Sequence, residues 1–173
     1  MNKKLTLLSP ALLERVHNKS MFDCGNEHLN IFLQNYAMQN NKNNSSRTYV
    51  SICKENNEIA GYYTLTYGSI SHLEATEKVK RQMPNYPIPV MILARLAVAK
   101  NYKKLGLGKG LLRDAMLRTL QASSLAGLRA IIAHAKDSKA KSFYLKYGFE
   151  ESPLDDYHLM LSMQEIKLAN FRE

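Results

Sequence analysis

The segment at residues 89–112 joins an apolar run, a glycine-containing turn and a helical pattern. Only Arg95 interrupts the apolar run at residues 90–98, and this pattern is typical of a strand buried on both faces. After Gly106 and Gly108, apolar residues recur at three- and four-residue spacing, which predicts a helix with one buried face. Such a unit directs free backbone N–H groups and the positive end of a helix dipole to one point. It therefore predicts an anion site, most often for a phosphate.

Three phosphate-binding patterns can be compared with this turn. Gly108-Lys109-Gly110 lacks the hydroxyl residue that follows the lysine in nucleotide-triphosphate loops. The glycines are spaced by twos and do not follow a first strand, which excludes the dinucleotide-binding fingerprint. The remaining pattern is Gln/Arg-x-x-Gly-x-Gly/Ala, which Lys103 to Gly108 match except at the first residue. A short glycine motif alone equally fits a helix start with tight packing.

The residue patterns along the chain predict an α+β protein with a mixed, mostly antiparallel central sheet flanked by helices. We expect strands at residues 5–8, 47–54, 59–70, 128–134 and 158–163, besides the central strand. We expect a helix that Asn26 caps and that fades at residues 40–44, a short helix at 73–83, and a helix that Ser138 caps and Gly148 ends. Residues 164–173 are expected to form a tail without defined structure.

The chain has a formal net charge of +9, and its basic residues are unevenly distributed. Residues 101–150 hold ten lysines and arginines against three acidic residues, which favours a polyanionic partner such as RNA. The alternative is that surface lysines only confer solubility. The longest nearly apolar run, residues 88–99, is too short to span a membrane, so we expect a cytoplasmic protein without membrane contact. Cys24, Cys53 and the scattered histidines match no metal-binding spacing.

Two motifs together resemble the signatures of the GNAT N-acetyltransferases. Lys103 to Gly108 resemble the loop that holds the pyrophosphate of acetyl-CoA in that family. Residues 140–149, AKSFYLKYGF, are similar to its second signature, Ala-x-x-Phe-Tyr-x-x-x-Gly-Phe. The resemblance implies the GNAT acyl-CoA N-acyltransferase fold as a single domain over residues 1–173, with acetyl-CoA as the acetyl donor and no metal.

A narrower resemblance covers about residues 20–163. Phe22-x-Cys24-Gly25-Asn26, Arg47-Thr48-Tyr49-Val50, Gly61-Tyr62-Tyr63-Thr64-Leu65 and Leu93-Ala94-Arg95-Leu96-Ala97-Val98 are similar to the GNAT toxins of type II toxin–antitoxin systems. Those enzymes acetylate the amino group of aminoacyl-tRNA and so block translation. The resemblance implies a small ribbon-helix-helix antitoxin as a partner, DNA contact only through that antitoxin, and a homodimer.

The resemblance also assigns site residues. Tyr144 is implied as the catalytic acid, although helical spacing alone favours a core aromatic. Candidate tRNA contacts are Arg47, Arg95, Lys139 and Lys146, for which a solvated lysine or an internally paired arginine is the ordinary alternative. Lys103 and Lys104 depart from the residues usual at their positions, Gln or Arg and, in many members, Gly. The residues implied to bind acetyl-CoA are Leu96, Ala97, Val98, Lys103, Lys104, Leu105, Gly106, Leu107, Gly108, Lys109 and Phe143.

The expected chemistry needs a neutral amine and a proton for the departing thiolate. A free α-amine has a pKa of about 8, so an aminoacyl group is partly neutral at pH 7 and needs no strong base. A tyrosine with a pKa of about 10 stays protonated and can serve as the acid. Two alternatives stay open: acetylation of a protein N-terminus, a polyamine or an antibiotic, and a nucleic-acid-binding or partner-binding module without catalysis.

Overall fold

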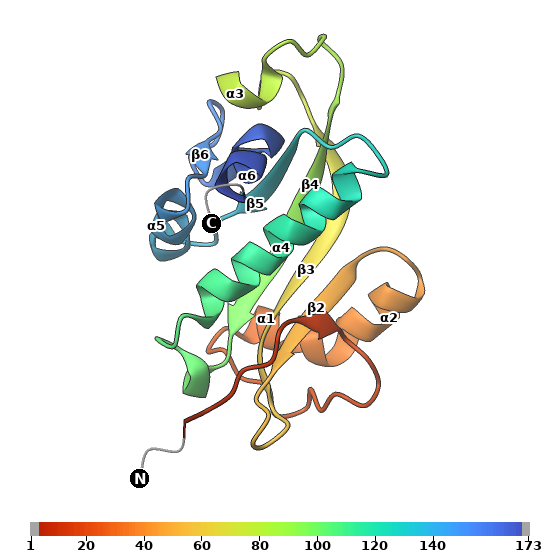
Figure 1. The fold of residues 1–173 in the computed structure, drawn as a ribbon, viewed down its shortest axis with the longest axis vertical. Coiled ribbons are helices and arrows are strands. Elements are labelled where there is room, and N and C mark those ends of the chain that lie inside the picture. The colour runs from red at the N-terminus through yellow and green to blue at the C-terminus, as the bar shows by residue number, and fades with distance from the viewer. Residues whose placement is uncertain (1–3, 171–173) are drawn as a thin grey trace. The chain divides into compact units, whose positions relative to one another are not determined.

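A computed structural model describes residues 4–170 of the 173-residue chain. Seven strands form one mixed sheet in the order β1-β2-β3-β4-β5-β7-β6 (Figure 1). The β4–β5 pair is parallel, whereas the β1–β2, β2–β3, β5–β7 and β6–β7 pairs are antiparallel. The expected mixed sheet with flanking helices is confirmed. The strands are β1 (Ala11–Leu12), β2 (Arg47–Ile52), β3 (Ile59–Ile70), β4 (Ile88–Val98), β5 (Ala130–His134), β6 (Glu150–Glu151) and β7 (His158–Ser162).

The first helical stretch consists of three consecutive segments, of which the middle one is π-helical. A short 3-10 turn precedes the long helix that follows β4. The helical elements are α1 (Glu27–Ile31), the π-helical η1 (Phe32–Tyr36), α2 (Ala37–Lys42), α3 (Glu77–Lys80), the 3-10 turn η2 (Lys100–Tyr102), α4 (Leu107–Ser123), α5 (Ser138–Lys146) and α6 (Met163–Asn170).

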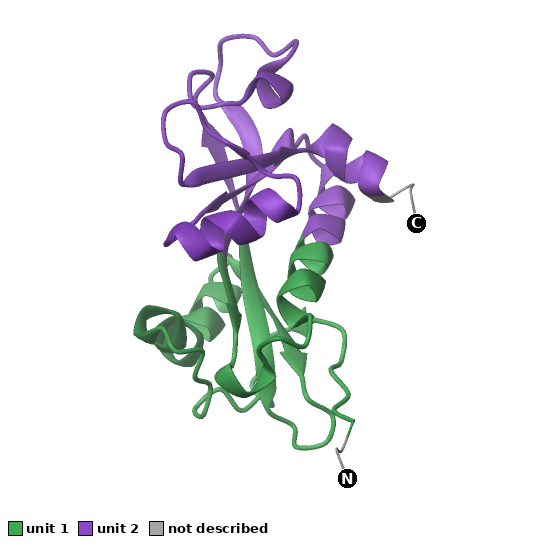
Figure 2. Cartoon of the chain, turned by 90° about the vertical axis from the view of Figure 1, so that its left-hand side faces the viewer, with its two compact units in different colours: residues 1–66, 95–115 green, residues 67–94, 116–173 purple. Residues whose placement is uncertain are grey.

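The chain divides into two compact units (Figure 2). Unit 1 comprises Met1–Thr66 and Arg95–Ala115, and unit 2 comprises Tyr67–Ala94 and Met116–Glu173. The strands β3 and β4 and the helix α4 each contribute residues to both units. Each unit has buried apolar residues of its own.

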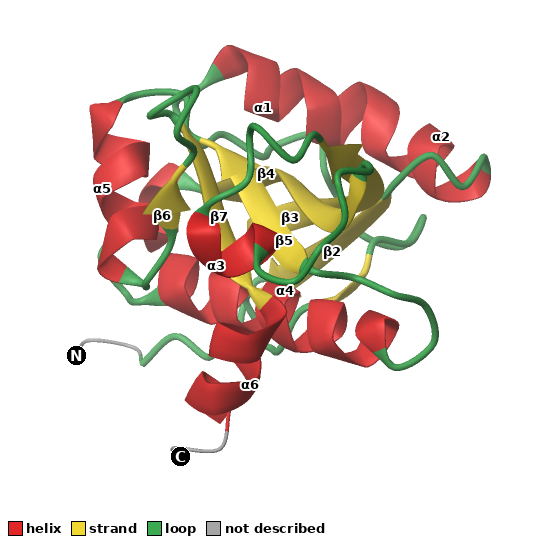
Figure 3. Ribbon diagram, turned by 90° about the horizontal axis from the view of Figure 1, so that it is seen from above, coloured by secondary structure: helices red, strands yellow, loops and turns green. Residues whose placement is uncertain are grey.

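The core of unit 1 is organised by two consecutive tyrosines on β3, Tyr62 and Tyr63. Both are fully buried, and because side chains alternate along a strand they point to opposite faces. Tyr62 stacks with Phe32, and its hydroxyl donates to the Leu29 carbonyl at 2.8 Å. The Tyr63 hydroxyl donates instead to the carboxylate of Asp114 on α4. The α1 and α4 helices therefore lie on opposite faces of β3 (Figure 3).

The core of unit 2 is formed around β5. The parallel register pairs Val90 with Ala130 and ends where Leu93 meets Ala133. Arg129 lies just before β5, and its guanidinium donates a hydrogen bond to the Val79 carbonyl of α3 at 2.7 Å. A buried apolar cluster lies between these elements and contains Ile70, Ala75, Val79, Ile88, Val90, Ala130, Ile132 and Met160.

The prediction of a strand at residues 5–8 is wrong. Leu7 makes only an isolated bridge to Cys53, and β1 begins at Ala11. The register shifts by one residue between the Leu7–Cys53 and Ala11–Val50 pairs, so the segment between them holds one residue more than the facing part of β2, as in a β-bulge. This segment contains Pro10, which has no N–H to donate to the neighbouring strand.

Two helices also differ from expectation in their boundaries, and one agrees with it. The first helix, which Asn26 caps as predicted, ends at Lys42, within the residues 40–44 where it was expected to fade. The cap of α5 is Asp137 and not Ser138, because the Asp137 carboxylate accepts from the Ala140 N–H at 2.8 Å. The predicted helix at residues 73–83 is only the four-residue α3, Glu77–Lys80.

The C-terminal segment expected to lack structure forms α6 up to residue 170, and residues 171–173 lie outside the described residues. Its start is a capping box, in which the Ser162 hydroxyl accepts from the Glu165 N–H at 3.2 Å. In return, the Glu165 carboxylate accepts from the Ser162 N–H at 3.1 Å. The Ser-x-x-Glu pattern was therefore readable in the sequence. The two-residue strand β6 was not expected from the sequence either.

Candidate active site

The C-terminal end of β4 extends past its parallel partner. The register with β5 ends at Leu93, whereas β4 continues to Val98. Ala97 is buried, and a Cβ atom placed on Gly61 of β3 would lie only 2.9 Å from the Ala97 carbonyl oxygen. Leu96 and Val98 are half-buried, so the expected burial of this strand on both faces holds only in part.

The turn between β4 and α4 contains two residues in the left-handed region. Lys104 has φ +64° and Gly106 has φ +79°. Lys104 occupies the position that the family resemblance gives to Gly in many members, and its backbone adopts the conformation that favours glycine. The substitution therefore keeps the shape of the turn and strains its backbone.

The start of α4 presents unsatisfied donors. Its first helical hydrogen bond runs from the Gly110 N–H to the Gly106 carbonyl at 3.2 Å. The N–H groups of Leu107, Gly108 and Lys109 precede that bond and have no intrahelical acceptor. A Cβ atom at Gly106 would meet no atom within 4 Å, so this face of the turn is open. These features fit a phosphate group.

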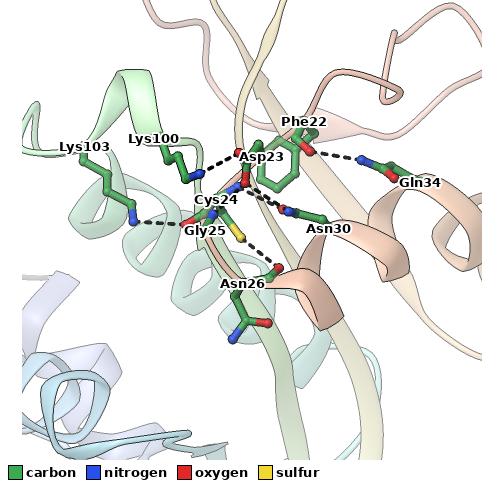
Figure 4. A network of polar contacts seen from close by, with 9 residues as sticks. All are labelled: Phe22, Asp23, Cys24, Gly25, Asn26, Asn30, Gln34, Lys100 and Lys103. Atoms are coloured by element: carbon green, nitrogen blue, oxygen red, sulfur yellow. Dashed lines mark hydrogen bonds and ion pairs between the residues drawn. The ribbon is translucent and has the colours of Figure 1, made fainter.

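The three lysines of this segment differ in their surroundings. The Lys103 ammonium donates to the Cys24 carbonyl at 3.0 Å, within a polar network that joins the turn to the loop before α1 (Figure 4). Lys104 and Lys109 are exposed and make no ion pair or hydrogen bond through their side chains within residues 4–170. Leu105 is 54% exposed. Lys104 and Lys109 are thus the cations available to a phosphate.

Tyr144 is the most buried of the predicted site residues in unit 2. Its side chain is 7% exposed, and its ring lies 5.3 Å from the ring centres of both Phe143 and Phe149. Burial raises the pKa of the Tyr144 phenol to about 12. Ser46 Oγ is the one fully buried side-chain polar atom without a partner in residues 4–170. The Tyr144 hydroxyl, which has no partner within those residues, therefore keeps a small exposure to solvent.

The helix that carries Tyr144 is anchored within unit 2 by Lys141. Its ammonium lies 2.8 Å from a Glu151 carboxylate oxygen and 3.1 Å from one of Asp156. The same ammonium lies 5.2 Å from the centre of the Tyr157 ring. The hydrogen bonds to these carboxylates raise the pKa of Lys141. The ion pairs restrain α5 against the β6–β7 region.

The four predicted tRNA contacts fall into two kinds. Arg47 donates to the Asn41 carbonyl and to the Asn44 side chain, both at 2.6 Å. Arg95 lies over the Phe32 ring. The two arginines thus have partners within unit 1. The two lysines on α5, Lys139 and Lys146, are exposed in unit 2, and the Lys146 ammonium lies 5.7 Å from the centre of the Tyr147 ring.

The predicted residues are distributed over both units. Unit 1 holds the end of β4, the turn, Lys109, Arg47 and Arg95, and unit 2 holds Phe143, Tyr144, Lys139 and Lys146. A cavity of about 410 Å³ within unit 1 is lined in part by Asp23, Lys100 and Tyr102, and by none of the predicted acetyl-CoA residues.

The sequence reading missed the roles of Asp23, Asn30 and Lys100. The Asp23 carboxylate accepts from the Gly25 N–H, the Asn30 amide and the Lys100 ammonium. These hydrogen bonds, above all that from Lys100, lower the pKa of Asp23 to about 2. The Phe22-x-Cys24-Gly25-Asn26 motif marked the position of this loop, but nothing in the sequence pattern indicated its contact with Lys100.

Residues 4–170 contain neither a membrane-spanning helix nor a metal-binding cluster. None of the helices within residues 4–170 has the length and apolar character needed to cross a membrane. Within the same part of the chain, no group of three or more His, Cys, Asp or Glu residues is placed to hold a metal ion.

Comparison with known proteins identifies the family. The acetyltransferase (GNAT) domain family matches residues 45–151. The tRNA-acetylating toxin of Mycobacterium tuberculosis is 38% identical over 159 residues, which cover 92% of this chain and 94% of the toxin.

Solved structures agree with this family assignment. AtaT complexed with acetyl-methionyl-tRNAfMet matches with a TM-score of 0.86 at 26% identity, covering 96% of this chain and 99% of AtaT. A Tyr-to-Phe mutant of AtaT, bound to the C-terminus of the antitoxin AtaR and to acetyl-CoA, matches with a TM-score of 0.78 at 27% identity. The match covers 99% of this chain and 100% of the mutant chain. The fold and the family expected from the sequence are confirmed: this chain belongs to the GNAT acetyltransferase family.

Proposed function

We propose that this protein is the toxin of a type II toxin–antitoxin system that transfers the acetyl group of acetyl-CoA to the α-amino group of aminoacyl-tRNA and thereby blocks translation. The observation that carries the proposal is the 38% identity to a tRNA-acetylating toxin over 92% of the chain. The match to AtaT in complex with acetyl-methionyl-tRNAfMet supports the same substrate class. The net charge of +9 supports a polyanionic substrate, which would be bound largely through its phosphates.

The donor is acetyl-CoA, which supplies an acetyl group on a thioester. The α-amine nitrogen forms a bond to the carbonyl carbon, the C–S bond breaks, and the amine loses one proton to solvent. Tyr144 donates its phenolic proton toward the departing thiolate and regains one from solvent. Its pKa of about 12 keeps the phenol protonated at neutral pH, so that the proton is present to be donated.

Other residues bind and orient the donor. The N–H groups of Leu107, Gly108 and Lys109 and the ammonium groups of Lys104 and Lys109 hold the pyrophosphate. The backbone of Leu96, Ala97 and Val98, which lies past the strand pairing with β5, supplies hydrogen bonds to the pantetheine arm and to the carbonyl oxygen. Leu105, Gly106 and Lys103 shape the turn, and Phe143 packs beside Tyr144.

The exposed Lys139 and Lys146 share α5 with Tyr144 and are the favoured tRNA contacts. Arg47 and Arg95 are secondary candidates because both have partners in unit 1.

The proposal also covers the domain organisation, the location, the oligomeric state and the partners of the protein. It acts as one catalytic domain over residues 1–173, in the cytoplasm where aminoacyl-tRNA is found, and as a homodimer. A small ribbon-helix-helix antitoxin neutralises it, and DNA is reached only through that antitoxin. The structure of the AtaT–AtaR complex bound to DNA, which matches with a TM-score of 0.75 at 26% identity, is consistent with such an assembly.

Purified protein incubated with acetyl-CoA and a mixture of charged tRNAs tests the proposal. Mass spectrometry should detect N-acetylated aminoacyl-tRNA, with none on uncharged tRNA and none on free amino acids. The Tyr144→Phe protein serves as the matched control for contaminating activity. Acetylation of a protein N-terminus or of a polyamine, with every charged tRNA unmodified, would reject the proposal.

A further inference from the structure

The loop before α1 is fastened to the turn before α4 by three hydrogen bonds within unit 1 (Figure 4). The Lys103 ammonium donates to the Cys24 carbonyl at 3.0 Å. The Lys100 ammonium donates to the Asp23 carboxylate at 2.8 Å, and the Lys100 N–H donates to the Asp23 carbonyl at 2.9 Å. We call these contacts of Asp23 and Cys24 with Lys100 and Lys103 the clasp.

The loop before α1, which contributes Asp23 and Cys24 to the clasp, is itself held by hydrogen bonds. Asn30, which is 7% exposed, donates to the Asp23 carboxylate at 3.1 Å and accepts from the Cys24 N–H at 2.9 Å. Gln34 of η1 donates to the Phe22 carbonyl at 3.0 Å. Because these bonds tie the loop to the buried side of the first helix, the loop can serve as an anchor for the turn.

Gly25 shows how closely the two sides of the clasp approach. It has φ +86°, and a Cβ atom at this position would lie 3.3 Å from Lys100 Cε and 3.9 Å from Lys103 Nζ. Both lysine side chains therefore lie against the glycine. A side chain at position 25 would be strained and would press on the lysines.

We propose that Lys103, Lys100 and Asp23 are positioning residues that hold the phosphate-binding turn in place through the clasp, and that the Lys103 side chain is not itself a ligand of the pyrophosphate. The proposal rests on the proposed function only in that the turn binds CoA. It assigns the electrostatic contact to Lys104 and Lys109, which lie in or just after the turn and have no other partner within residues 4–170.

The chemistry at position 103 supports this assignment. The Lys103 ammonium already has an acceptor in the Cys24 carbonyl, and moving it onto a phosphate would break that bond. Lys shares with Gln and Arg, the residues usual at this motif position, a terminal N–H donor, whereas Gln carries no charge. The common property is thus the ability to donate a hydrogen bond.

Two variants that change the local charge in opposite directions test the clasp. Asp23→Asn removes a negative charge and Lys100→Met removes a positive one, and both weaken the same ion pair. Isothermal titration with CoA measures the dissociation constant of each. Direct electrostatics predicts that Asp23→Asn binds the anion more tightly and Lys100→Met less tightly. The clasp predicts that both bind more weakly, by about 3- to 10-fold, as expected for the loss of one hydrogen bond that orders the turn.

A second pair separates positioning from direct contact at the turn. Lys103→Met should weaken CoA binding by a factor that stays the same between about 50 mM and 500 mM salt, since the lost interaction is internal. Lys104→Met, the matched control on the adjacent exposed lysine, should weaken CoA binding at low salt and much less at high salt.

Amide hydrogen exchange gives a structural readout of the same variants. Exchange in residues 22–26 should accelerate in Lys103→Met and stay unchanged in Lys104→Met. The clasp is rejected if Asp23→Asn binds CoA as tightly as the unaltered protein, or if the Lys103→Met effect declines with salt as that of Lys104→Met does. Absence of CoA binding by the unaltered protein would instead reject the proposed function.

Discussion

The Arg95 guanidinium lies 3.6 Å from the centre of the Phe32 ring. Arg95 belongs to the C-terminal part of β4, and Phe32 begins the π-helical η1, so the contact joins the strand that leads into the phosphate turn to the first helix of unit 1. Phe32 is 5% exposed and also stacks with Tyr62. The cation is thus part of the packing of unit 1.

Arg95→Met should therefore lower the free energy of unfolding by about 1 kcal/mol, the range of a partly desolvated cation–π contact. Urea denaturation measures the change. Lys139→Met, which alters an exposed lysine that has no partner within residues 4–170, is the matched control and should change the stability by less than about 0.5 kcal/mol. Equal stability of Arg95→Met and the unaltered protein would show that the contact contributes nothing.

Tyr144→Phe should reduce kcat by about 100- to 10,000-fold, since it removes the acid and keeps the ring that packs against Phe143 and Phe149. The dissociation constant for CoA and the melting temperature should stay the same. Single-turnover acetylation assays measure the rate, and calorimetry measures the dissociation constant and the melting temperature. A variant that keeps full activity would remove Tyr144 from the mechanism.

The pH dependence of the reaction follows from the pKa of Tyr144. Because burial raises this pKa to about 12, the phenol stays protonated through the neutral and mildly alkaline range. The rate should rise with pH as the substrate amine, whose pKa is about 8, loses its proton, and it should then level off. Initial rates between about pH 6 and 9.5 test this, and a decline on the alkaline side below about pH 9.5 would contradict a phenol with a raised pKa.

Lys104→Gly separates the conformation of the turn from its charge. Lys104 has φ +64°, which costs a non-glycine residue about 1–2 kcal/mol, whereas the greater freedom of glycine in the unfolded chain costs about 0.4–1 kcal/mol. The variant should thus be more stable by up to about 1.5 kcal/mol in urea denaturation and still bind CoA more weakly, because the ammonium is lost. Loss of stability would indicate that the Lys104 side chain contributes contacts of its own.

The acid side of the stability curve should depend on Asp23. Hydrogen bonds, first that from Lys100, lower its pKa in the folded protein from 3.8 to about 2. A carboxyl whose pKa is depressed by folding stabilises the protein above its unfolded pKa, and this contribution disappears as the pH falls from about 4 to 2. The stability difference between the unaltered protein and Asp23→Asn should therefore shrink over that range, as measured by urea denaturation at a series of pH values. A difference that does not change with pH would contradict the lowered pKa.

Local patterns in the sequence were sufficient to predict several helices and strands. The hairpin-like turn at residues 55–58 predicted a strand at residues 59–70, which are the observed bounds of β3. Asn26 predicted the start of α1 because a cap acts through its own backbone neighbours. The turn and its helix were recognisable because the glycine motif and the helical spacing are local. The Phe143-Tyr144 signature belongs to the same class of signal, and the catalytic role that it implies for Tyr144 remains a prediction.

Only the tertiary structure decided what contacts residues distant in the sequence would make. The predicted strand at residues 5–8 is an isolated bridge because its register against β2 depends on a bulge beside Pro10. In the sequence, Arg47 and Lys103 resemble free cations, but each donates a hydrogen bond to a backbone carbonyl. The acceptor of Lys103 is the carbonyl of Cys24, 79 positions away in the chain. The sequence by itself determined the family, the main elements and the phosphate turn, since these depend on spacing along the chain. The tertiary structure decided which lysines remain available to a phosphate, because that depends on the acceptors that folding places within reach.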